Sequence, residues 1–166
     1  MKYGIYYAYW EKEWNGDYKY YIDKISKLGF DILEISCGAF SDYYTKDQEL
    51  IDIGKYAKEK GVTLTAGYGP HFNESLSSSE PNTQKQAISF WKETLRKLKL
   101  MDIHIVGGAL YGYWPVDYSK PFDKKRDLEN SIKNMKIISQ YAEEYDIMMG
   151  MEVLNRFEGY MLNTCD

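Results

Sequence analysis

The chain of 166 residues is long enough for one domain, and its 44% of apolar residues is enough for a hydrophobic core. A formal net charge of −4 provides no basic field, which argues against nucleic acid or an anionic membrane as a partner. Only two cysteines, a start at Met1 without a long apolar leader, and no run of roughly 20 apolar residues predict a cytoplasmic protein outside the membrane.

Strands and helices are predicted to alternate along the chain. Short apolar runs predict strands at residues 3–9, 31–36, 62–68, 104–110 and 147–154. Apolar residues at helical spacing predict helices at residues 17–28, 45–61, 83–100 and 126–145. Thr45 is the expected N-cap of the second helix, and Pro81 stands where a helix start tolerates proline.

This alternation favours a parallel sheet built from βα units, with functional groups in the loops after the strands. Both a barrel and an open doubly wound sheet satisfy the pattern. The sequence has no G-x-G-x-x-G motif after the first strand, which weakens the open-sheet alternative because dinucleotide folds carry their phosphate-binding turn there. Gly107 and Gly108 predict a close approach of the backbone, either to a ligand or to a neighbouring strand.

The repetition stops at the fifth predicted strand. Asn163 and Thr164 resemble a cap for a helix that does not follow. Five strands would leave an open parallel edge, which native proteins normally cover or close. We therefore expect residues 1–166 to be one piece of a longer domain.

Two acids mark the end of the fifth predicted strand. Glu152 lies near its carboxyl end, on what reads as a buried strand, and Glu158 lies just beyond. A carboxylate in such a place is costly unless it is paired or binds a metal, and Arg156 is the obvious partner if the role is structural. Position at a strand end favours a functional role for both acids.

Five blocks of sequence carry a resemblance to a known enzyme family. They are Gly4–Trp10 with Trp14, Lys27–Glu34, Leu64–Pro70, Gly107–Leu110 with Tyr113–Pro115, and Glu152–Glu158 with Leu162–Thr164. In order and spacing these blocks are similar to the D-psicose (allulose) and D-tagatose 3-epimerases of the xylose isomerase-like superfamily. The resemblance covers essentially the whole chain and implies an α/β fold, a (β/α)8 TIM barrel truncated to about its first five βα units.

The resemblance also implies roles for single residues. Glu152 matches a glutamate that binds a divalent metal and serves as one of two acid/base carboxylates beside the sugar C3. Glu158 matches an acid that hydrogen-bonds the substrate near O1 and the carbonyl group. The other matching positions line the substrate pocket: Tyr6, Trp14, Ala66, Gly108, Leu110 and Trp114. For Trp14 and Trp114 a role in core packing stays open.

The family's chemistry is the inversion of a ketohexose at C3, as between D-fructose and D-psicose or between D-tagatose and D-sorbose. A metal ion (Mn²⁺, Co²⁺ or Mg²⁺) assists removal of the C3 proton, a cis-enediolate forms, and a second carboxylate returns a proton on the opposite face. The other metal ligands and the second base belong to later strands in that family. We therefore expect this chain alone to be inactive, and the complete enzyme to be a homodimer or homotetramer.

Three alternatives remain at this level. One is another sugar or inositol isomerase or dehydratase of the same barrel superfamily, and another is a non-catalytic half-barrel. The third is the AP-endonuclease-like branch, which would need a basic surface and more histidines at strand ends. His104 is expected in the core or at the opposite end of the barrel, His71 in a loop, and Cys37 has no neighbour that marks it as a nucleophile.

Overall fold

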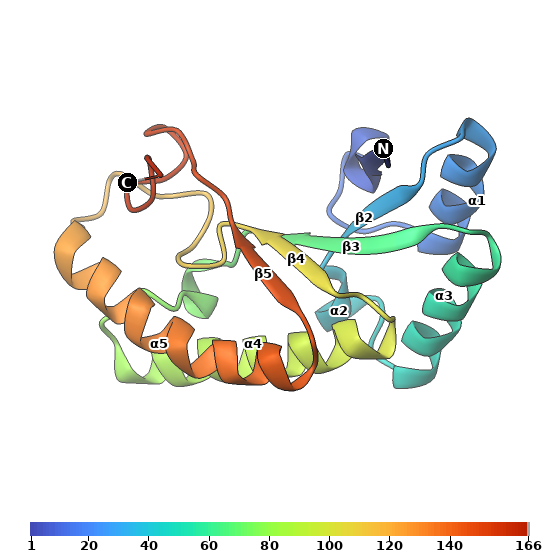
Figure 1. Cartoon of the computed structure of the whole chain (residues 1–166). Coiled ribbons are helices and arrows are strands. Elements are labelled where there is room, and N and C mark those ends of the chain that lie inside the picture. The colour runs from blue at the N-terminus through green and yellow to red at the C-terminus, as the bar shows by residue number, and fades with distance from the viewer. Residues whose placement is uncertain (166) are drawn as a thin grey trace. The chain divides into compact units, whose positions relative to one another are not determined.

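The computed structural model describes residues 1–165, and for residues 41 and 42 it describes the backbone alone. The strands are β1 (Gly4–Tyr6), β2 (Ile32–Ser36), β3 (Thr63–Tyr68), β4 (Ile105–Gly108) and β5 (Met148–Met151). The helices are α1 (Tyr18–Leu28), α2 (Ala39–Asp42), α3 (Asp47–Glu59), α4 (Pro81–Leu100) and α5 (Lys124–Glu144), with two short 3-10 helices, η1 (Tyr7–Tyr9) and η2 (Phe72–Glu74). Figure 1 shows the predicted alternation of strand and helix.

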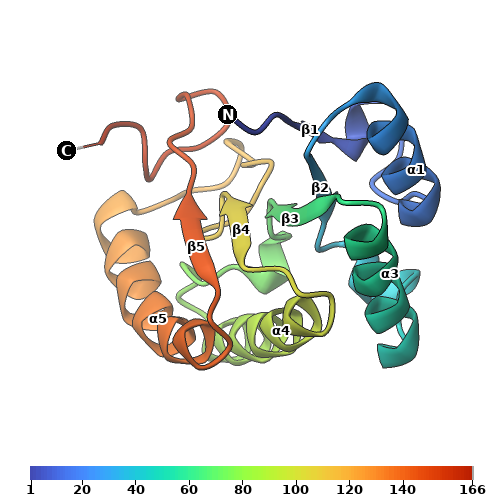
Figure 2. The same ribbon diagram turned by 45° about the vertical axis from the view of Figure 1, so that its right-hand side comes forward.

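The five strands form one parallel sheet in the order β1-β2-β3-β4-β5. The register pairs Tyr6 of β1 with Glu34 of β2, and Glu34 with Thr65 of β3. The arrows of β4 and β5 point the same way in Figure 2. A doubly wound sheet reverses its strand order at a switch point, whereas this sheet adds each strand beside the previous one, as a barrel wall does. The strand order therefore supports the truncated barrel over the open sheet.

The chain divides into two compact units. Unit 1 comprises Met1–Gly67 and Thr94–Val106, and unit 2 comprises Tyr68–Glu93 and the chain from Gly107 onward. The prediction of a single domain over residues 1–166 stays a prediction. Among the described residues, no helix has both the length and the apolar character needed to cross a membrane.

Helices α1 and α3 pack together in unit 1 over a core of apolar side chains. Helix α1 begins where the Asp17 carboxylate accepts a hydrogen bond from the Tyr20 backbone N–H at 3.1 Å, and ends at Gly29 with φ of 82°. Of the apolar residues at helical spacing that predicted α1, Tyr21, Ile22 and Ile25 are buried, whereas Leu28 at its end is 58% exposed. Fully buried members of this core are Tyr18, Ile22, Ile25, Leu33, Ile35 and Leu50.

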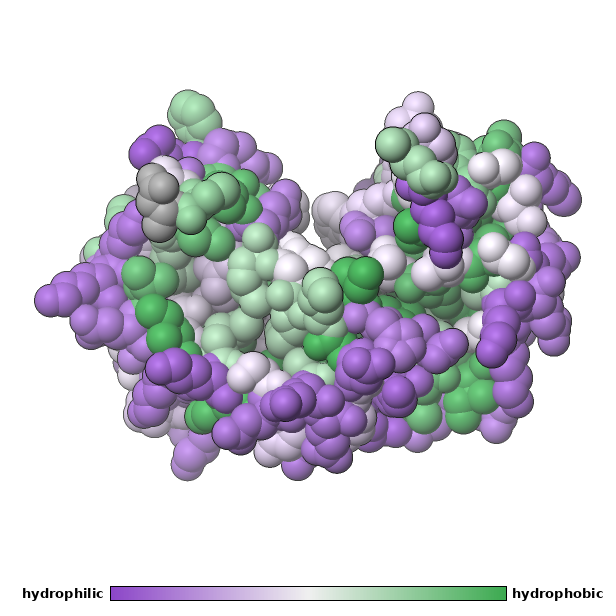
Figure 3. Space-filling view, viewed as in Figure 1, coloured by the Kyte–Doolittle hydropathy of each residue, from purple (hydrophilic) through white to green (hydrophobic). Residues whose placement is uncertain are grey.

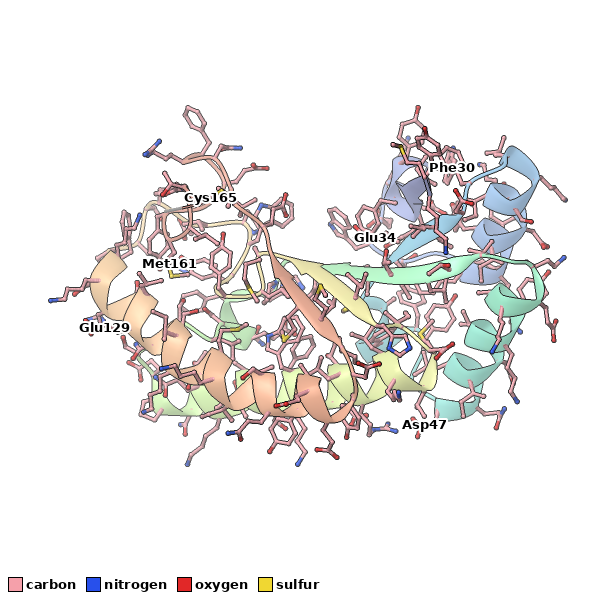
Figure 4. The ribbon with its side chains drawn as sticks, viewed as in Figure 1. Phe30, Glu34, Asp47, Glu129, Met161 and Cys165 are labelled. Atoms are coloured by element: carbon pink, nitrogen blue, oxygen red, sulfur yellow. The ribbon has the colours of Figure 1, made fainter. Side chains whose placement is uncertain are left out.

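Unit 2 has a core of aromatic and sulfur-containing side chains. Tyr111, Tyr160 and Met161 are buried together, and Met151 of β5 packs against them. Figure 4 marks Met161 in the loop after β5, close to the beginning of α5. Because Tyr111 and Tyr160 belong to different loops, this cluster ties the loop after β4 to the loop after β5.

Some predicted boundaries are wrong for a physical reason. Strand β1 ends at Tyr6, because the Trp10 N–H bonds to the Tyr7 carbonyl at 3.1 Å and closes a 3-10 turn. Thr45 is not the N-cap of α3: Lys46 takes that place and makes no capping bond with its side chain. Pro81 is the first residue of α4, as a missing N–H permits.

Candidate functional site

Glu152 follows directly after β5, and both polar groups of its backbone are held. Its N–H donates to the Gly108 carbonyl at 3.0 Å, and its carbonyl accepts from the Tyr111 hydroxyl at 3.1 Å. Its side chain is exposed. The structure therefore fixes the main chain of Glu152 at the carboxyl end of a strand and leaves the carboxylate accessible, as an acid/base group requires.

The expectation that Glu152 ends a buried strand was wrong. Strand β5 is last in the sheet order and has a neighbour on one side, and Met148 is 69% exposed. The predicted strand 147–154 is also shorter, since pairing stops at Met151. In Figure 3, apolar surface lies open over β5 next to the hydrophilic surface of α5. This exposure is what an unpaired sheet edge produces.

The loop that carries Glu158 is closed by main-chain and amide bonds. The Leu154 N–H donates to the Leu162 carbonyl at 3.1 Å. The Asn163 side-chain amide donates to the carbonyls of Leu154, at 2.9 Å, and Gly159, at 2.8 Å. The Asn163 amide thus holds the two ends of this loop together, and its role as a helix cap stays a prediction.

Glu158 is exposed and is bonded to Asn155 within the same loop. The Asn155 side-chain amide donates to the Glu158 carboxylate, and the Asn155 side-chain oxygen accepts from the Glu158 N–H at 3.1 Å. Within residues 1–165, Arg156 forms no ion pair with Glu152 or Glu158, so the structural partner suggested by the sequence does not play that part.

Gly108 has a conformation that only glycine adopts readily. Its φ is +123°, and a Cβ at this position would lie 2.2 Å from the Tyr68 carbonyl oxygen. Of the two interpretations left open by the sequence, the structure confirms the close approach of a neighbouring strand. Contact of Gly108 with a sugar stays a prediction.

Leu110 and Trp114 lie in the loop after β4 and differ in exposure. Leu110 is fully buried, whereas Trp114 is half-buried. The Trp114 N–H donates to the Pro70 carbonyl at 2.8 Å. Glycine at position 69 leaves room for Trp114, because a Cβ there would lie 3.0 Å from the Trp114 Cβ. Trp114 thus packs on the loop after β3, and a part of its ring remains accessible. Their contacts with substrate stay predictions.

In unit 1, Glu34 shares one face of the sheet with Tyr6 and Thr65. Register places the three side by side, and the Thr65 hydroxyl lies 3.5 Å from the Glu34 carboxylate. A Cβ at Gly67 would come within 3.0 Å of the same carboxylate. Figure 4 shows Glu34 on the side of β2 away from α2 and α3. Glu34 was not predicted as a site residue, although it carries the same signal as Glu152, an acid in an apolar strand.

Tyr6 is half-buried, and its ring centre lies 6.2 Å from that of Trp14, which is 57% exposed. Burial raises the pKa of Tyr6 to about 12, and the negative charge of Glu34 adds to the rise. The phenol therefore stays protonated at neutral pH and can donate a hydrogen bond to a sugar oxygen.

Ala66 is fully buried and pairs with Ile35 rather than with Glu34. Because side chains alternate along a strand, its Cβ lies on the face opposite to that of Thr65 and Gly67. Contact of Ala66 with a sugar stays a prediction, and Thr65 and Gly67 are the positions in β3 that share the face of Glu34.

The two histidines contact acids other than Glu152. His71 caps η2, and its N–H bonds to the Glu74 carboxylate at 2.9 Å. His104 is exposed just before β4, with its ring nitrogen 3.2 Å from Asp102, so it lies at the amino end of its strand and not in the core.

Burial raises the pKa of the Cys37 thiol well above its ordinary value, which disfavours the nucleophilic thiolate.

A divalent metal needs several oxygen or nitrogen ligands that converge. Within the described part of the chain, no group of three or more His, Cys, Asp or Glu side chains could hold a metal ion. Glu152 can supply one carboxylate, and the described residues by themselves do not fit a complete metal site.

A model of the xylose isomerase-like TIM barrel family matches residues 22–166. The chain belongs to this family. It is 57% identical over all of its 166 residues to the D-psicose 3-epimerase of Enterocloster bolteae, and 48% identical over 164 residues to that of Ruminiclostridium cellulolyticum. It spans 55% of the length of each of these curated relatives.

Solved structures agree with the sequence comparison. The D-psicose 3-epimerase of Clostridium cellulolyticum H10, solved with D-tagatose, superposes with a TM-score of 0.95 and is 48% identical, over 99% of this chain and 56% of that one. A D-psicose 3-epimerase solved in the presence of D-fructose gives a TM-score of 0.94 at 44% identity, over 99% of this chain and 56% of that one. The predicted resemblance and the fold class, an N-terminal portion of a TIM barrel, are confirmed.

Proposed function

We propose that this chain forms the N-terminal part of the barrel of a ketose 3-epimerase. The proposed reaction interconverts D-fructose and D-psicose, or D-tagatose and D-sorbose. The observation that carries the proposal is the placement of Glu152, whose carboxylate is exposed directly after β5 while its backbone is bonded on both sides. Relatives that are 57% and 48% identical and bear the name D-psicose 3-epimerase support it.

In the proposed reaction Glu152 moves a proton at C3 of the ketose. Inversion needs two bases on opposite faces of the sugar, because a single base would return the proton to the side it came from. The second base is proposed to come from the part of the barrel that this chain does not span. The chain alone should therefore fail to epimerise any ketose.

Two other residues are proposed to bind the substrate. Glu158 would accept a hydrogen bond from the hydroxyl at O1, in an orientation set by the amide of Asn155. Tyr6, a protonated phenol, would donate to a sugar oxygen. These contacts orient the ketose, and orientation contributes to the rate because it removes the entropic cost of alignment from the chemical step.

The complete enzyme is proposed to need a divalent metal, Mn²⁺, Co²⁺ or Mg²⁺, with Glu152 as one oxygen ligand. The proposal rests on the resemblance to the 3-epimerases and on the oxygen chemistry of a carboxylate. We also propose a homodimer or homotetramer for the complete protein, and the cytoplasm as its location because the chain has only two cysteines.

A chimera tests the proposal. Residues 1–166 would be joined to the segment that follows the matched 55% of the Enterocloster bolteae enzyme. We expect this chimera, with Mn²⁺ or Co²⁺ added, to interconvert D-fructose and D-psicose in an HPLC assay, and residues 1–166 alone to show no turnover. A folded chimera that is inert with every ketohexose would reject the proposed function.

The role of Glu152 is tested by Glu152→Gln in the same chimera. Loss of a general base lowers kcat by about 10³-fold or more, while the fold should be retained. Glu129→Gln is the matched control, because Glu129 is an exposed acid on α5, and it should leave turnover unchanged. Turnover retained by Glu152→Gln would remove Glu152 from the mechanism.

A further inference from the structure

The structure assigns Tyr111 as the positioning residue for Glu152, an inference that rests on the proposed function. Glu152 lies one residue past the end of β5, where the regular pairing of the strand has stopped. The peptide group that follows it is held by a side chain instead: the Tyr111 hydroxyl donates to the Glu152 carbonyl at 3.1 Å. The Tyr111 hydroxyl thereby restrains the peptide group that follows Glu152.

Tyr111 is itself held at its ring and at its main chain. The side chain is 7% exposed and its ring packs with Tyr160 and Met161. The Tyr111 carbonyl accepts a hydrogen bond from the Ser131 hydroxyl of α5 at 2.6 Å. A short chain of contacts thus runs from the buried face of α5 through Tyr111 to the backbone of Glu152.

Loss of the Tyr111 hydroxyl should let the peptide after Glu152 rotate. The Glu152 N–H would still bond to the Gly108 carbonyl but would open more often, so the strand end would stay near its place while the carboxylate moves. A misplacement of about 1 Å can lower a rate by up to about 10²-fold without removing any catalytic group. The effect should therefore fall on kcat and leave KM nearly unchanged.

The first test uses residues 1–166 and needs no activity. In Tyr111→Phe we expect amide hydrogen exchange, followed by NMR, to speed up about tenfold at Glu152 and Val153. Tyr56→Phe is the matched control, because it also removes one tyrosine hydroxyl, which donates to Asp23 at 2.8 Å in unit 1. Unchanged exchange at Glu152 and Val153 in Tyr111→Phe would overturn the inference.

The second test measures kinetics in the chimera. We expect Tyr111→Phe to lower kcat about tenfold with KM within about twofold of the parent. Exchange that speeds up while kcat stays unchanged would overturn the inference. If Tyr111→Phe does not fold, Ser131→Ala replaces it. This variant should also speed up exchange at Glu152 and Val153 and lower kcat, each to a smaller extent. The absence of both changes would overturn the inference.

The two proposals can fail separately. An inert parent chimera rejects the proposed function, and the exchange experiment still decides whether Tyr111 holds the backbone of Glu152. An active chimera with unchanged exchange and kinetics in Tyr111→Phe keeps the proposed function and rejects the role of Tyr111.

Discussion

The two units hold their candidate residues in different ways. In unit 1, Tyr6 and Glu34 lie on paired strands, and the register of the sheet alone places them side by side. In unit 2, Glu152 and Glu158 lie past the end of β5, and bonds from the end of β4 and from the loops after β4 and β5 hold them. The comparison shows that a strand fixes the position of a functional residue. Past the end of a strand, the orientation of that residue depends on polar contacts from other parts of the fold.

Helix α5 provides the foundation of this second arrangement. Its buried face carries three polar residues, each bonded to a loop of unit 2: Asp127 to the Tyr160 hydroxyl at 2.8 Å, Ser131 to the Tyr111 carbonyl at 2.6 Å, and Asn134 to the Leu76 carbonyl at 2.7 Å. Unit 1 places apolar side chains such as Ile22 and Ile25 on the equivalent face of α1. Burial of a polar side chain costs free energy, and hydrogen bonds to buried groups of the loops offset that cost.

The largest expected effect separates glycines in the two units. Gly108→Ala should lower the free energy of unfolding by about 3–5 kcal/mol, because its Cβ would meet the Tyr68 main chain and its φ is positive. Gly29→Ala, also at positive φ but with no atom within 4 Å of the added Cβ, should cost only about 1 kcal/mol. Urea unfolding of both variants measures the difference, and equal costs would show that the approach of the Tyr68 carbonyl is unimportant.

A smaller effect tests the polar face of α5. Asn134→Leu leaves the buried Leu76 carbonyl without its donor, and should lower the free energy of unfolding by about 2 kcal/mol. Asn130→Leu, one turn earlier and half-exposed, should change it by less than about 0.5 kcal/mol because water can replace the lost bonds. Thermal unfolding with both variants gives the comparison. A neutral Asn134→Leu would mean that unit 2 is held by apolar packing, like unit 1.

The smallest effect is expected in alkaline solution. Burial raises the pKa of Tyr6 in unit 1 and of Tyr111 in unit 2 to about 12, above the value of about 10 for an unfolded tyrosine. The stability linked to these phenols is complete below pH of about 10 and is lost as pH rises through about 12. In Tyr111→Phe and in Tyr6→Phe, the fall in the free energy of unfolding with rising pH should be smaller by roughly 1 kcal/mol or less. Urea unfolding between pH 9 and 11 measures it, and identical pH profiles would contradict the burial of these hydroxyls.

Local patterns were enough to predict much of the fold. The apolar spacing in α1 and the start of α4 at Pro81 were confirmed, since both depend on neighbours along the chain. The position of Glu152 at a strand end followed from the same kind of pattern. Errors came at the ends of elements: Tyr7 leaves the first strand for a 3-10 turn, and Thr45 yields the cap position of α3 to Lys46.

The sequence by itself determined the order of strands and helices, the family, and the place of Glu152, because periodicity and motif spacing are written in adjacent residues. Only the tertiary structure decided how Glu152 is held, which residues of β3 share the face of Glu34, and that the Tyr68 main chain lies against Gly108. Tyr111 and Glu152 are 41 residues apart, and no local pattern relates them. Their bond exists because packing on α5 brings two loops together, which is a property of the folded chain and not of any segment within it.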